Sequence, residues 1–490
     1  MKLFAIRGGI HPDYRKELSA SAAIVALPMP RVLTLPLQQH LGAPASPVVA
    51  VGDLVKKGQL LARGQGAISA PVHASTSGRI SAIGEFPAPH PSGLTQPSIQ
   101  LESDGLDEWG ALPEPLADPF AAPAKEISDR VSAAGIVGLG GAAFPSAVKL
   151  SLGSRYKLQI LLLNGAECEP YLTCDDRVMR EHADEVIDGA RIMAHALGTP
   201  RIVIAIEDNK PEAQNIMTKA AAAFSNVEVI GVPVQYPKGS ERHLTQALIG
   251  LETPARMLTA DLGVVVHNVA TARAVHQAIR LGRPLVSRVV AVSGGAVTQP
   301  KNIEVPLGAP VSELIAFCHG LKGKPKRIIS GGPMMGQPLP SLDVPVVKGT
   351  SGILALTEAE INERPAAPCI RCGTCVTICP CGLVPVEMAS FIRKEHLEDA
   401  ARIGVMDCVS CGSCSYVCPS HIPLVQFFNY AKGRLNALDR ERRKSEQVKT
   451  LVAAHSQRME KLAIAKREAA AAAAAKKAKP ETSVESSTSA

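Results

Sequence analysis

Four apolar runs alternate with amphipathic segments in the middle of the chain. The runs are LQILLLNG, RIVIAIED, VEVIGVPV and LGVVVHNV, and each has the length of a buried β-strand. Between them, DEVIDGARIMAHAL and PEAQNIMTKAAAAF repeat apolar residues at the three- and four-residue spacing of a helix. Alternating strands and helices are typical of a parallel sheet, so residues 126–280 are predicted to form an α/β domain.

Shorter β-like runs, separated by glycine and proline, flank this segment on both sides. Residues 1–125 contain GDLVKKGQLLARG and ISAPVHASTSGRISAIG, which predict a barrel-sandwich hybrid of the kind found in lipoyl carriers. The lysine-bearing turn that carriers modify is not recognisable, so we interpret this module as structural. Residues 285–345, with SRVVAVSGGAV and NIEVPLGAPVSELIAF, predict a β-grasp-like (SLBB) module. The predicted fold class is multidomain, α/β plus β.

The chain changes character after a Pro/Ala hinge, NERPAAP. Residues 364–430 hold two cysteine runs separated by VEMASFIRKEHLEDAARIG, which has a helical pattern, and they predict a helix-rich, ferredoxin-like domain. Residues 431–490 predict a basic helix that passes into a low-complexity Ala/Lys tail. That tail is expected to be disordered beyond about residue 476.

Composition and charge narrow the compartment and the partners. Aromatic residues make up 3% of the chain, so the core must be aliphatic. No apolar run approaches the roughly 18–20 residues of a membrane span, and MKLFAIRGGIHP lacks the features of a secretory signal, which together predict a cytoplasmic protein. The net charge of +7 is modest and no nucleic-acid partner is expected. The basic stretch KGRLNALDRERRKSEQVK suits anionic lipid or an acidic subunit, although a solvated charged helix is the simpler interpretation.

Two copies of the spacing C-x₂-C-x₂-C-x₃-C-P, in CIRCGTCVTICP and CVSCGSCSYVCP, carry eight of the twelve cysteines. Zinc sites usually combine two separated CxxC pairs, whereas three cysteines at this spacing can hold three corners of one cubane, so [4Fe–4S] is favoured over zinc. In such motifs the fourth cysteine commonly ligates the other cluster. That rule assigns Cys369, Cys372, Cys375 and Cys418 to cluster 1, and Cys379, Cys408, Cys411 and Cys414 to cluster 2.

This interleaving would hold the two clusters close together, which predicts an electron relay. The four other cysteines carry weaker signals. Cys381 lies inside the cluster loop and is interpreted as a spare thiol, and Cys318 follows an apolar run and is expected in a core. For Cys168 and Cys174 a ligand role is the less favoured interpretation.

A glycine-rich segment, GIVGLGGAAFPSAVKL, opens a predicted helix and has the features of a phosphate-binding loop. Gly138, Gly140 and Gly141 leave backbone N–H groups exposed to an anion, and Lys149 follows one to two turns later. The segment lacks the GK[ST] of a Walker A loop. A purely structural glycine turn remains an equal alternative on this pattern alone.

Polar residues follow the next predicted strand, in LLLNGAECEPYLTCDDR. Asn164, Glu167 and Glu169 fall at the carboxyl end of that strand, where α/β sheets bind their ligands. Carboxylates and an amide at this place suit the hydroxyl groups of ribitol or ribose.

Together these two stretches resemble the flavin and NADH site of the NADH-binding (51 kDa) subunit of respiratory complex I. That family carries a GRGGAGFPTGxKW-type loop followed by N-A-D-E-x-E-P, and HNVAT at residues 267–271 is similar to its NNVET. The resemblance implies FMN as cofactor and NADH as substrate. The implied contacts are Gly138, Gly140, Gly141 and Lys149 for the FMN phosphate, Asn164 and Glu167 for the isoalloxazine and ribityl side, Phe144 and Glu169 for NADH, Asn268 and Thr271 near the flavin, and Glu241 as a further ligand.

The sequence also departs from this family. Ala166 replaces an Asp, Ala142 stands before Ala143 where the family has Gly, and His267 replaces an Asn. The GSE that ends at Glu241 stands in place of GEE. Each departure changes one of the expected flavin contacts.

The beginning of the chain narrows the family further. GGIHP at residues 8–12, LPLQQHLGAPASPVVAVGDLVKKGQ and APVHASTSG resemble the C subunit of the bacterial Rnf electron-transport complex, and the likeness extends to about residue 430. It implies that electrons pass from NADH through FMN and two [4Fe–4S] clusters to a ferredoxin-like subunit and integral membrane subunits, or in reverse, with ion translocation. It also implies a translocase-class enzyme without a general acid or base, peripheral on the cytoplasmic face of the bacterial inner membrane.

Two other functions stay open from the sequence. A soluble cobalamin reductase of bacterial microcompartments shares the flavin and two-cluster modules, although the GGIHP opening favours the Rnf family. A non-enzymatic iron–sulfur relay or scaffold, with a degenerate flavin fold, is kept open by the Ala166 and His267 departures.

Overall fold

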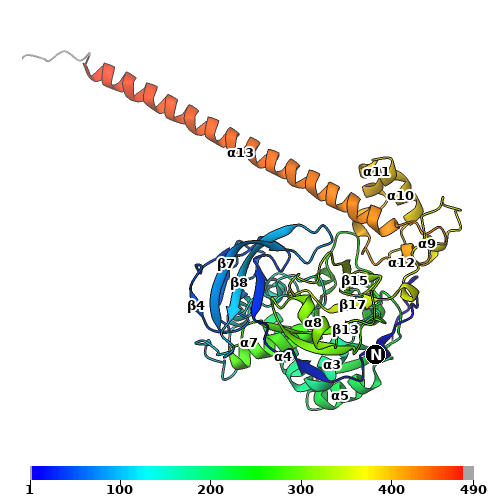
Figure 1. Ribbon diagram of the computed structural model, residues 1–490. Helices are drawn as coiled ribbons and strands as arrows, with labels where there is room; N and C mark the ends of the chain where they lie inside the picture. The colour runs from blue at the N-terminus through cyan, green and yellow to red at the C-terminus, as the bar shows by residue number, and fades with distance from the viewer. Residues whose placement is uncertain (1–2, 478–490) are drawn as a thin grey trace, which may run out of the picture.

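A computed structural model describes residues 3–477 as four folded modules and a long projecting helix (Figure 1). The first module is a small β-sandwich of two antiparallel sheets, with strand orders β2-β8-β7-β4 and β3-β5-β6. Its strands are β2 (Val32–Pro36), β3 (Ser46–Pro47), β4 (Leu54–Val55), β5 (Leu60–Arg63), β6 (Val72–His73), β7 (Gly78–Pro87) and β8 (Thr95–Ser103). Leu33, Leu35, Ile99 and Leu101 alternate along two paired strands and are fully buried. The predicted barrel-sandwich module is thus confirmed.

The second module contains a parallel sheet of order β11-β10-β9-β12, built from the four predicted apolar runs. The strands are β9 (Ile160–Gly165), β10 (Arg201–Glu207), β11 (Val227–Val232) and β12 (Val264–Asn268). The helices are α1 (Ala124–Ala133), α2 (Ser146–Leu150), α3 (Cys174–Glu181), α4 (Ala183–Leu197), α5 (Pro211–Ala221), α6 (Glu241–Ile249) and α7 (Val269–Leu281).

Both faces of this parallel sheet are covered, which explains why its strands are apolar throughout. Leu161 and Leu163 of β9 point into the core shared with α4 and α7, while Leu162 packs on the opposite face against Leu244 of α6. The polar ends of β9 and β12 lie side by side, because Asn164 is the register partner of Asn268.

The third module is a mixed sheet of order β1-β14-β13-β17-β15-β16 with one helix, α8 (Val311–Phe317). Its strands are β1 (Ile24–Ala26), β13 (Ser287–Ser293), β14 (Lys301–Pro306), β15 (Arg327–Ser330), β16 (Gln337–Pro338) and β17 (Gly352–Leu356). The β-grasp-like (SLBB) expectation is confirmed. The structure adds a strand from the N-terminal segment, since β1 pairs in parallel with β14 and covers that edge of the sheet.

The cysteine runs lie in a small helical module at one end of the body. It contains α9 (Thr374–Thr377), α10 (Pro385–Arg393), α11 (Leu397–Arg402), α12 (Ser413–Tyr416) and the start of α13 (Leu424–Lys477). Met388, Ile392, Leu424 and Phe428 form part of its core. The helical pattern expected between the runs appears as two helices, α10 and α11.

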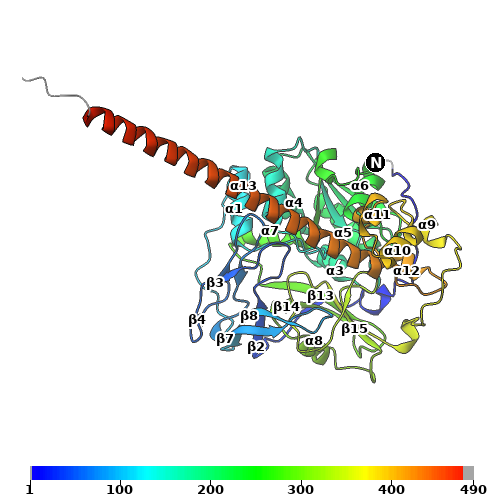
Figure 2. The ribbon, with the colours of Figure 1, turned by 90° about the horizontal axis from the view of Figure 1, so that it is seen from above.

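Helix α13 leaves the body after its first turns and projects away from every other module (Figures 1 and 2). It includes the Ala/Lys-rich stretch up to Lys477, which is close to the residue at which the sequence predicted the helix to end. The tail expected to be disordered lies, from residue 478 on, outside the described residues. None of the helices within residues 3–477 has a stretch long and apolar enough to cross a bilayer.

Candidate functional site

A cleft of about 670 Å³ opens at the carboxyl ends of β9 and β12. This volume is in the range of pockets that hold small ligands and cofactors. Ten of the eleven flavin and NADH residues implied by resemblance line the cleft: Gly138, Gly140, Gly141, Phe144, Lys149, Asn164, Glu167, Glu169, Glu241 and Asn268.

The glycine loop forms one wall of this cleft. The Gly138 N–H donates to the Phe144 carbonyl at 2.8 Å and closes the loop. A Cβ on Gly140 would lie 3.3 Å from the Asn268 Cβ, so glycine lets the loop approach the end of β12 without crowding it. Gly141 has a φ of +113°, a conformation that favours glycine, and faces open space. The loop therefore presents bare backbone to the cleft.

Lys149 of α2 is held in place by two acceptors. Its Nζ donates to the Val266 carbonyl at 3.0 Å and forms an ion pair with Glu241 at 2.7 Å. The Thr259 hydroxyl donates to the other oxygen of the Glu241 carboxylate. Lys149 thus enters the cleft as a fixed cation whose charge Glu241 already balances in part.

Asn164 and Glu167 arrange the loop that follows β9. The Asn164 amide donates to the Gly239 carbonyl at 2.7 Å, and its oxygen accepts from the Ala166 N–H at 3.1 Å. Glu167, with a φ of +50°, accepts from the Asp175 N–H at 2.7 Å at the start of α3. A carboxylate at this end of a helix is stabilised by the unpaired N–H groups and the helix dipole.

Asn268 caps α7 and Thr271 supports the glycine loop. The Asn268 side-chain oxygen accepts from the Ala270 N–H at 2.8 Å, and its amide donates to Asp175 at 2.6 Å. Thr271 is fully buried, and its hydroxyl accepts from the Leu139 N–H at 2.9 Å. Thr271 is the implied contact that does not line the cleft, so it acts on the site through the loop.

Glu169 is engaged by the third module, which the sequence did not connect with this site. Its carboxylate accepts from the Met334 N–H at 3.1 Å and the Met335 N–H at 2.9 Å. Burial raises the pKa of Glu169 to about 7, against the opposing effect of these two hydrogen bonds. A Cβ on Gly332 would lie 2.1 Å from the Glu169 carboxylate, so the loop GGPMMG (residues 331–336) needs glycine there. That glycine-rich loop was the overlooked signal.

Asp175 is another residue that sequence reasoning missed, although it lies in the TCDDR motif. One ligand atom each from Glu167, Cys174 and Asp175 lie within 4.8 Å of one another. Burial, followed by the charge of Glu167, raises the pKa of Asp175 to about 7. Burial also raises the pKa of the Cys174 thiol, which argues against a thiolate ligand at this place.

The fit of the cleft to a polar cofactor can be judged from two buried polar atoms. Neither has a hydrogen-bond partner among the described residues. They are the Ser146 hydroxyl at the start of α2 and the Nε2 of His267, and both residues line the cleft. Burial, assisted by the charge of Lys149, holds the pKa of His267 well below its usual range, so the imidazole is neutral. Unsatisfied buried groups are costly unless a ligand completes them, so this donor set fits a phosphate-bearing cofactor. Ala166 is fully buried and is not a cleft residue.

The thiols of the two cysteine runs come together in two sets of four. Burial raises the pKa of Cys375, and the charges of Cys372, Cys418 and Cys369 raise it further. Burial likewise raises the pKa of Cys414, with added effects from Cys411, Cys408 and Cys379. The sets that interact electrostatically are therefore the interleaved ones, with one cysteine exchanged between the runs.

The second set adjoins the cleft. Cys411 itself lines the cleft, and Cys379, Cys408 and Cys414 lie in an adjoining hollow with it. Tyr236 is fully buried at the cleft, and its hydroxyl donates a hydrogen bond to the Cys411 carbonyl at 2.7 Å. In the first set, by contrast, Cys369 and Cys372 are exposed to solvent.

The remaining cysteines differ in their surroundings. Cys318 is fully buried in the core of the third module, as expected. The Cys381 sulfur lies 3.9 Å from Nε2 of His243 on α6, and its thiol is hydrogen-bonded to Cys379. Cys168 lines the cleft, and burial raises the pKa of its thiol to about 12, so it is a neutral thiol.

The N-terminal segment ties the cleft to the cysteine module. The Gly9 N–H donates to the Ile378 carbonyl at 2.9 Å, next to Cys379. Lys16 donates to the carbonyl groups of Glu167 (2.8 Å), Glu169 (3.0 Å) and Leu172 (2.6 Å). Lys16 thereby fixes the acidic loop after β9.

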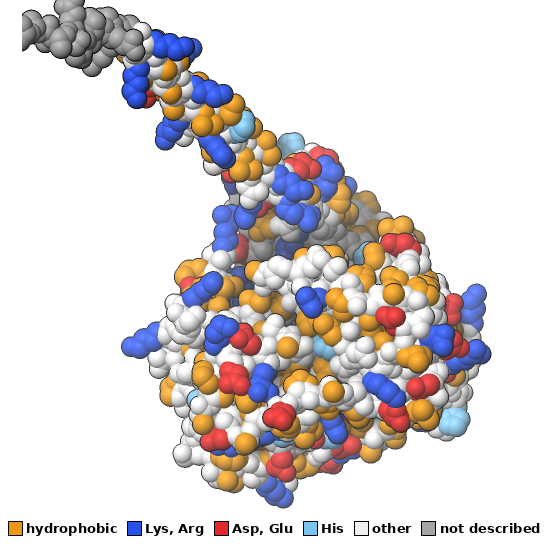
Figure 3. Space-filling view, turned by 90° about the vertical axis from the view of Figure 1, so that its left-hand side faces the viewer, with side chains coloured by type: hydrophobic (Ala, Val, Ile, Leu, Met, Phe, Trp, Pro, Cys, Tyr) orange, Lys and Arg blue, Asp and Glu red, His pale blue; other side chains and the backbone are white. Residues whose placement is uncertain are grey.

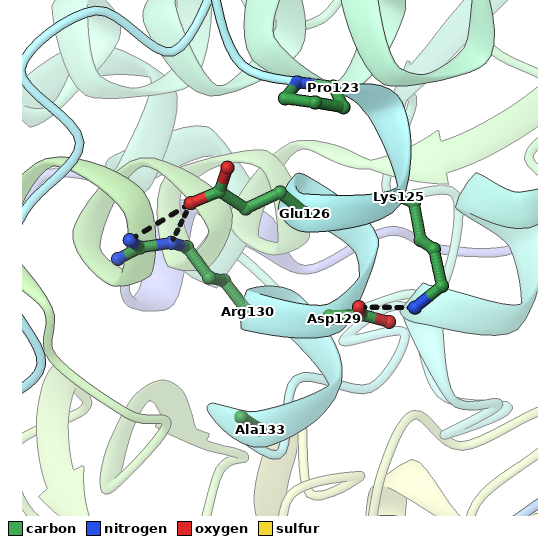
Figure 4. Close-up of a pocket in the computed structure, with 6 residues that line it drawn as sticks. All are labelled: Pro123, Lys125, Glu126, Asp129, Arg130 and Ala133. Carbon is green, nitrogen blue, oxygen red and sulfur yellow. Dashed lines mark hydrogen bonds and ion pairs between the residues drawn. The ribbon is translucent and has the colours of Figure 1, made fainter.

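A separate hollow on the outer side of α1 is a surface feature (Figure 4). Its charged side chains neutralise one another along the helix, Lys125 with Asp129 at 2.6 Å and Arg130 with Glu126 at 3.1 Å. Such exposed i,i+4 pairs stabilise a helix weakly and do not require a ligand.

Four family models match the chain in the order of these modules. They are described as "RnfC Barrel sandwich hybrid domain" (residues 4–106), "Nuo51 FMN-binding domain" (131–277), "SLBB domain" (289–338) and "4Fe-4S dicluster domain" (368–422). The glycine loop and β9–β12 lie inside the FMN-binding match, and both cysteine runs lie inside the dicluster match.

Three curated relatives align with nearly the whole chain. The C subunit of the ion-translocating oxidoreductase complex of Rhodobacter capsulatus is 55% identical over 447 residues, covering 91% of this chain and 86% of the relative. The C subunit of the proton-translocating ferredoxin:NAD(+) oxidoreductase complex of Clostridium ljungdahlii is 44% identical, covering 90% and 96%. The C subunit of the ion-translocating oxidoreductase complex of Pseudomonas aeruginosa is 44% identical, covering 91% of this chain and 57% of that longer protein.

Proposed function

The chain belongs to the family of the C subunits of ion-translocating (Rnf) oxidoreductase complexes, and on this premise we propose that it exchanges electrons between NADH and the other subunits. It is one subunit of a multi-subunit enzyme of the translocase class, and it carries FMN and two [4Fe–4S] clusters. When bound, FMN supplies two-electron chemistry toward NADH and one-electron chemistry toward iron–sulfur clusters.

One observation carries this proposal: Cys411 of the cysteine module lines the same cleft as the glycine loop of the FMN-binding domain. A cleft that served only as a scaffold would not need a cluster ligand in its wall. Phosphate binding is assigned to the loop N–H groups and Lys149, and polar contacts to Asn164, Glu167, His267 and Ser146. Glu169 is proposed to hold the GGPMMG loop against the NADH side of the cleft.

The cluster ligands follow the interleaved rule in this proposal. Cluster 2, beside the cleft, is assigned to Cys379, Cys408, Cys411 and Cys414, and cluster 1 to Cys369, Cys372, Cys375 and Cys418. These residues would hold cluster 2 beside the cleft and cluster 1 on the side of the module where Cys369 and Cys372 are exposed. The clusters would supply one-electron transfer between the cleft and a partner subunit, in either direction.

The partners are proposed to include a ferredoxin-like subunit and integral membrane subunits of the complex. We place the chain at the cytoplasmic face of the bacterial inner membrane as a peripheral subunit. Support comes from the names of the relatives, which are subunits of ion-translocating complexes, and from the reducing environment that free cluster thiolates need. The soluble cobalamin reductase is not favoured, because relatives that align with about nine-tenths of the chain belong to such complexes.

Anaerobic titration of the full, cluster-loaded chain with NADH tests the proposal. We expect NADH to bleach the flavin absorbance and the EPR signals of reduced clusters to appear. Lys149→Met should weaken flavin retention about tenfold or more, through loss of a charge-assisted phosphate contact, whereas Lys125→Met on α1 should not. A brown protein that releases no flavin and does not react with NADH would instead support the non-enzymatic relay.

The ligand assignment has its own matched test, because Cys379 and Cys381 are near neighbours of the same residue type. Cys379→Ser should remove the EPR signal of cluster 2 and keep that of cluster 1, although Cys379 belongs to the first run. Cys381→Ser should keep both signals. Loss of cluster 1 in Cys379→Ser would refute the interleaving.

A further inference from the structure

The exposed part of α13 is a long helix that hardly touches the rest of the described chain. From Leu438 to Lys477 every residue is exposed, and the segment extends about 60 Å into solvent at 1.5 Å per residue (Figures 1 and 2). Near its start, Arg442 forms an exposed ion pair with Glu398 of α11 at 2.9 Å. Such a helix gains little stability from packing on the body. The pattern of apolar and charged side chains along the helix therefore indicates the kind of surface that it contacts.

One face of this helix is apolar. Val448, Val452, Met459 and Leu462 follow one another at spacings that keep them on one side, and each is at least half exposed. Leu451 lies at the edge of the same face and is 69% exposed. Single exposed apolar residues are ordinary on a surface, whereas a helical stripe of them is typical of a contact face.

The apolar face is bordered by positive charge. Residues 440–467 contain nine Lys and Arg against three Glu, and the space-filling view shows Lys and Arg along the projecting helix (Figure 3). Arg458 flanks the stripe on one side, and Arg442 and Lys449 flank it on the other, while Lys444 lies one turn before Val448 at the angular position of Leu462. Two copies packed in parallel along this stripe would bring these cations together, which disfavours pairing of α13 with itself. An anionic surface is complementary.

We propose that residues 440–467 of α13 form an interfacial helix that binds the anionic surface of a lipid bilayer. The stripe of Val448, Val452, Met459 and Leu462 enters the boundary between headgroups and acyl chains, and the flanking Lys and Arg contact lipid phosphates. This gives a chain without a membrane-spanning helix in its described residues a contact of its own with the membrane. The inference rests on the proposed peripheral location and adds its physical basis.

Two similar substitutions, one inside the stripe and one outside it, distinguish insertion of the apolar stripe from attraction by charge alone. Val452 lies in the stripe, whereas Ile464, 48% exposed, lies about 160° around the helix from Val448 at 100° per residue. Val452→Glu and Ile464→Glu make the same change in charge and a similar change in hydrophobicity. The full cluster-loaded chain and both variants would be sedimented with phosphatidylcholine vesicles, with and without phosphatidylglycerol.

We expect the wild-type chain to bind the anionic vesicles, to release them at high salt, and to ignore pure phosphatidylcholine. Val452→Glu should weaken binding at least about tenfold, and Ile464→Glu less than about twofold. NADH bleaching of the flavin, measured on the same samples, should be unchanged in both variants. This readout separates a failure of membrane binding from a failure of the proposed electron transfer.

Three outcomes would overturn the proposal. Equal loss in the two variants would reduce the interaction to net charge. A concentration-dependent dimer, abolished by Val452→Glu and accompanied by no vesicle binding, would make the stripe an interface between copies. Binding that requires the membrane subunits and ignores protein-free vesicles would make it a protein-docking face.

Discussion

The two cysteine runs have the same local structure and opposite surroundings. Arg371 and Ser410, the second residue after the first cysteine of each run, have φ values of +56° and +55°. Their N–H groups donate to the sulfur of Cys369 at 3.4 Å and of Cys408 at 3.3 Å. Each run then continues through a left-handed glycine into a helix of four residues, α9 or α12.

Beyond the loop itself the resemblance ends. Cys369 and Cys372 of the first run are exposed, whereas Cys411 and Cys414 of the second run are buried. The second run packs against Tyr236, which lines the cleft, and against Met334 of the GGPMMG loop. The repeated spacing therefore determines the local conformation of each loop, and tertiary contacts determine which loop adjoins the cleft. The repeated sequence does not reveal this difference in surroundings between the two runs.

The prediction with the largest expected effect tests this difference between the two runs directly. Cys369→Ser should abolish the EPR signal of cluster 1 and leave cluster 2 reducible by NADH, because cluster 2 adjoins the cleft. Cys411→Ser should abolish the signal of cluster 2 and also leave cluster 1 unreduced by NADH, while dithionite still reduces it. Rapid-freeze EPR after mixing with NADH measures both. Normal reduction of cluster 1 by NADH in Cys411→Ser would reverse the proposed order.

A smaller effect concerns the GGPMMG loop, which packs beside the second run. Glu169 holds the GGPMMG loop through the N–H groups of Met334 and Met335, and the Met334 carbonyl lies beside Gly412. The pKa of Glu169 is raised to about 7 in the folded protein, chiefly by burial. The neutral acid is therefore favoured by folding, so its stabilising contribution is full below about pH 4.5 and is lost as the pH rises to about 7.

Glu169→Gln keeps the side chain neutral at every pH and isolates this contribution. Between pH 5 and 8 the free energy of unfolding of the wild type should fall by about 1–3 kcal/mol relative to Glu169→Gln, since water in the cleft reduces the full effect. Urea titrations of both proteins across this range measure the difference. A difference that does not change with pH would show that Glu169 is ionised throughout.

The modules were predictable because each carries its own local pattern. Four apolar runs predicted the parallel sheet, and the two cysteine runs predicted the iron–sulfur module. What the sequence did not reveal are contacts between modules. Lys16 on the acidic loop, Glu169 on the GGPMMG loop and Tyr236 on Cys411 join residues more than 150 positions apart. The hydrophobic periodicity of the sequence does not reveal such pairs, because they depend on how the folded modules pack against one another.

Thr271 and Asn268 illustrate the same limit inside one module. Resemblance placed both near the flavin, and the structure separates them, since Asn268 lines the cleft and Thr271 lies behind the loop. The two residues are less than one helical turn apart in sequence. Their roles differ because the start of α7 points one side chain outward and the other toward Leu139.

The smallest expected effect is the difference in stability between alanine variants at the equivalent glycines of the two runs. Gly373 and Gly412 have φ values of +80° and +78°, so alanine at either position should cost about 1 kcal/mol in backbone strain. A Cβ on Gly373 meets nothing within 4 Å, whereas one on Gly412 would lie 3.0 Å from the Met334 carbonyl oxygen. The crowding should cost about 1 kcal/mol more, so Gly412→Ala is expected to lose about twice as much stability as Gly373→Ala.

Urea unfolding of the two variants measures this difference, and EPR shows which cluster is disturbed. Gly412→Ala should also perturb cluster 2 and slow its reduction by NADH, because the GGPMMG loop must move away to accept the new methyl group. Gly373→Ala supplies the same strain without a neighbour and should leave both the loop and cluster 2 unchanged. Equal losses would mean that the second run, despite its burial, is no more constrained by the cleft than the exposed first run.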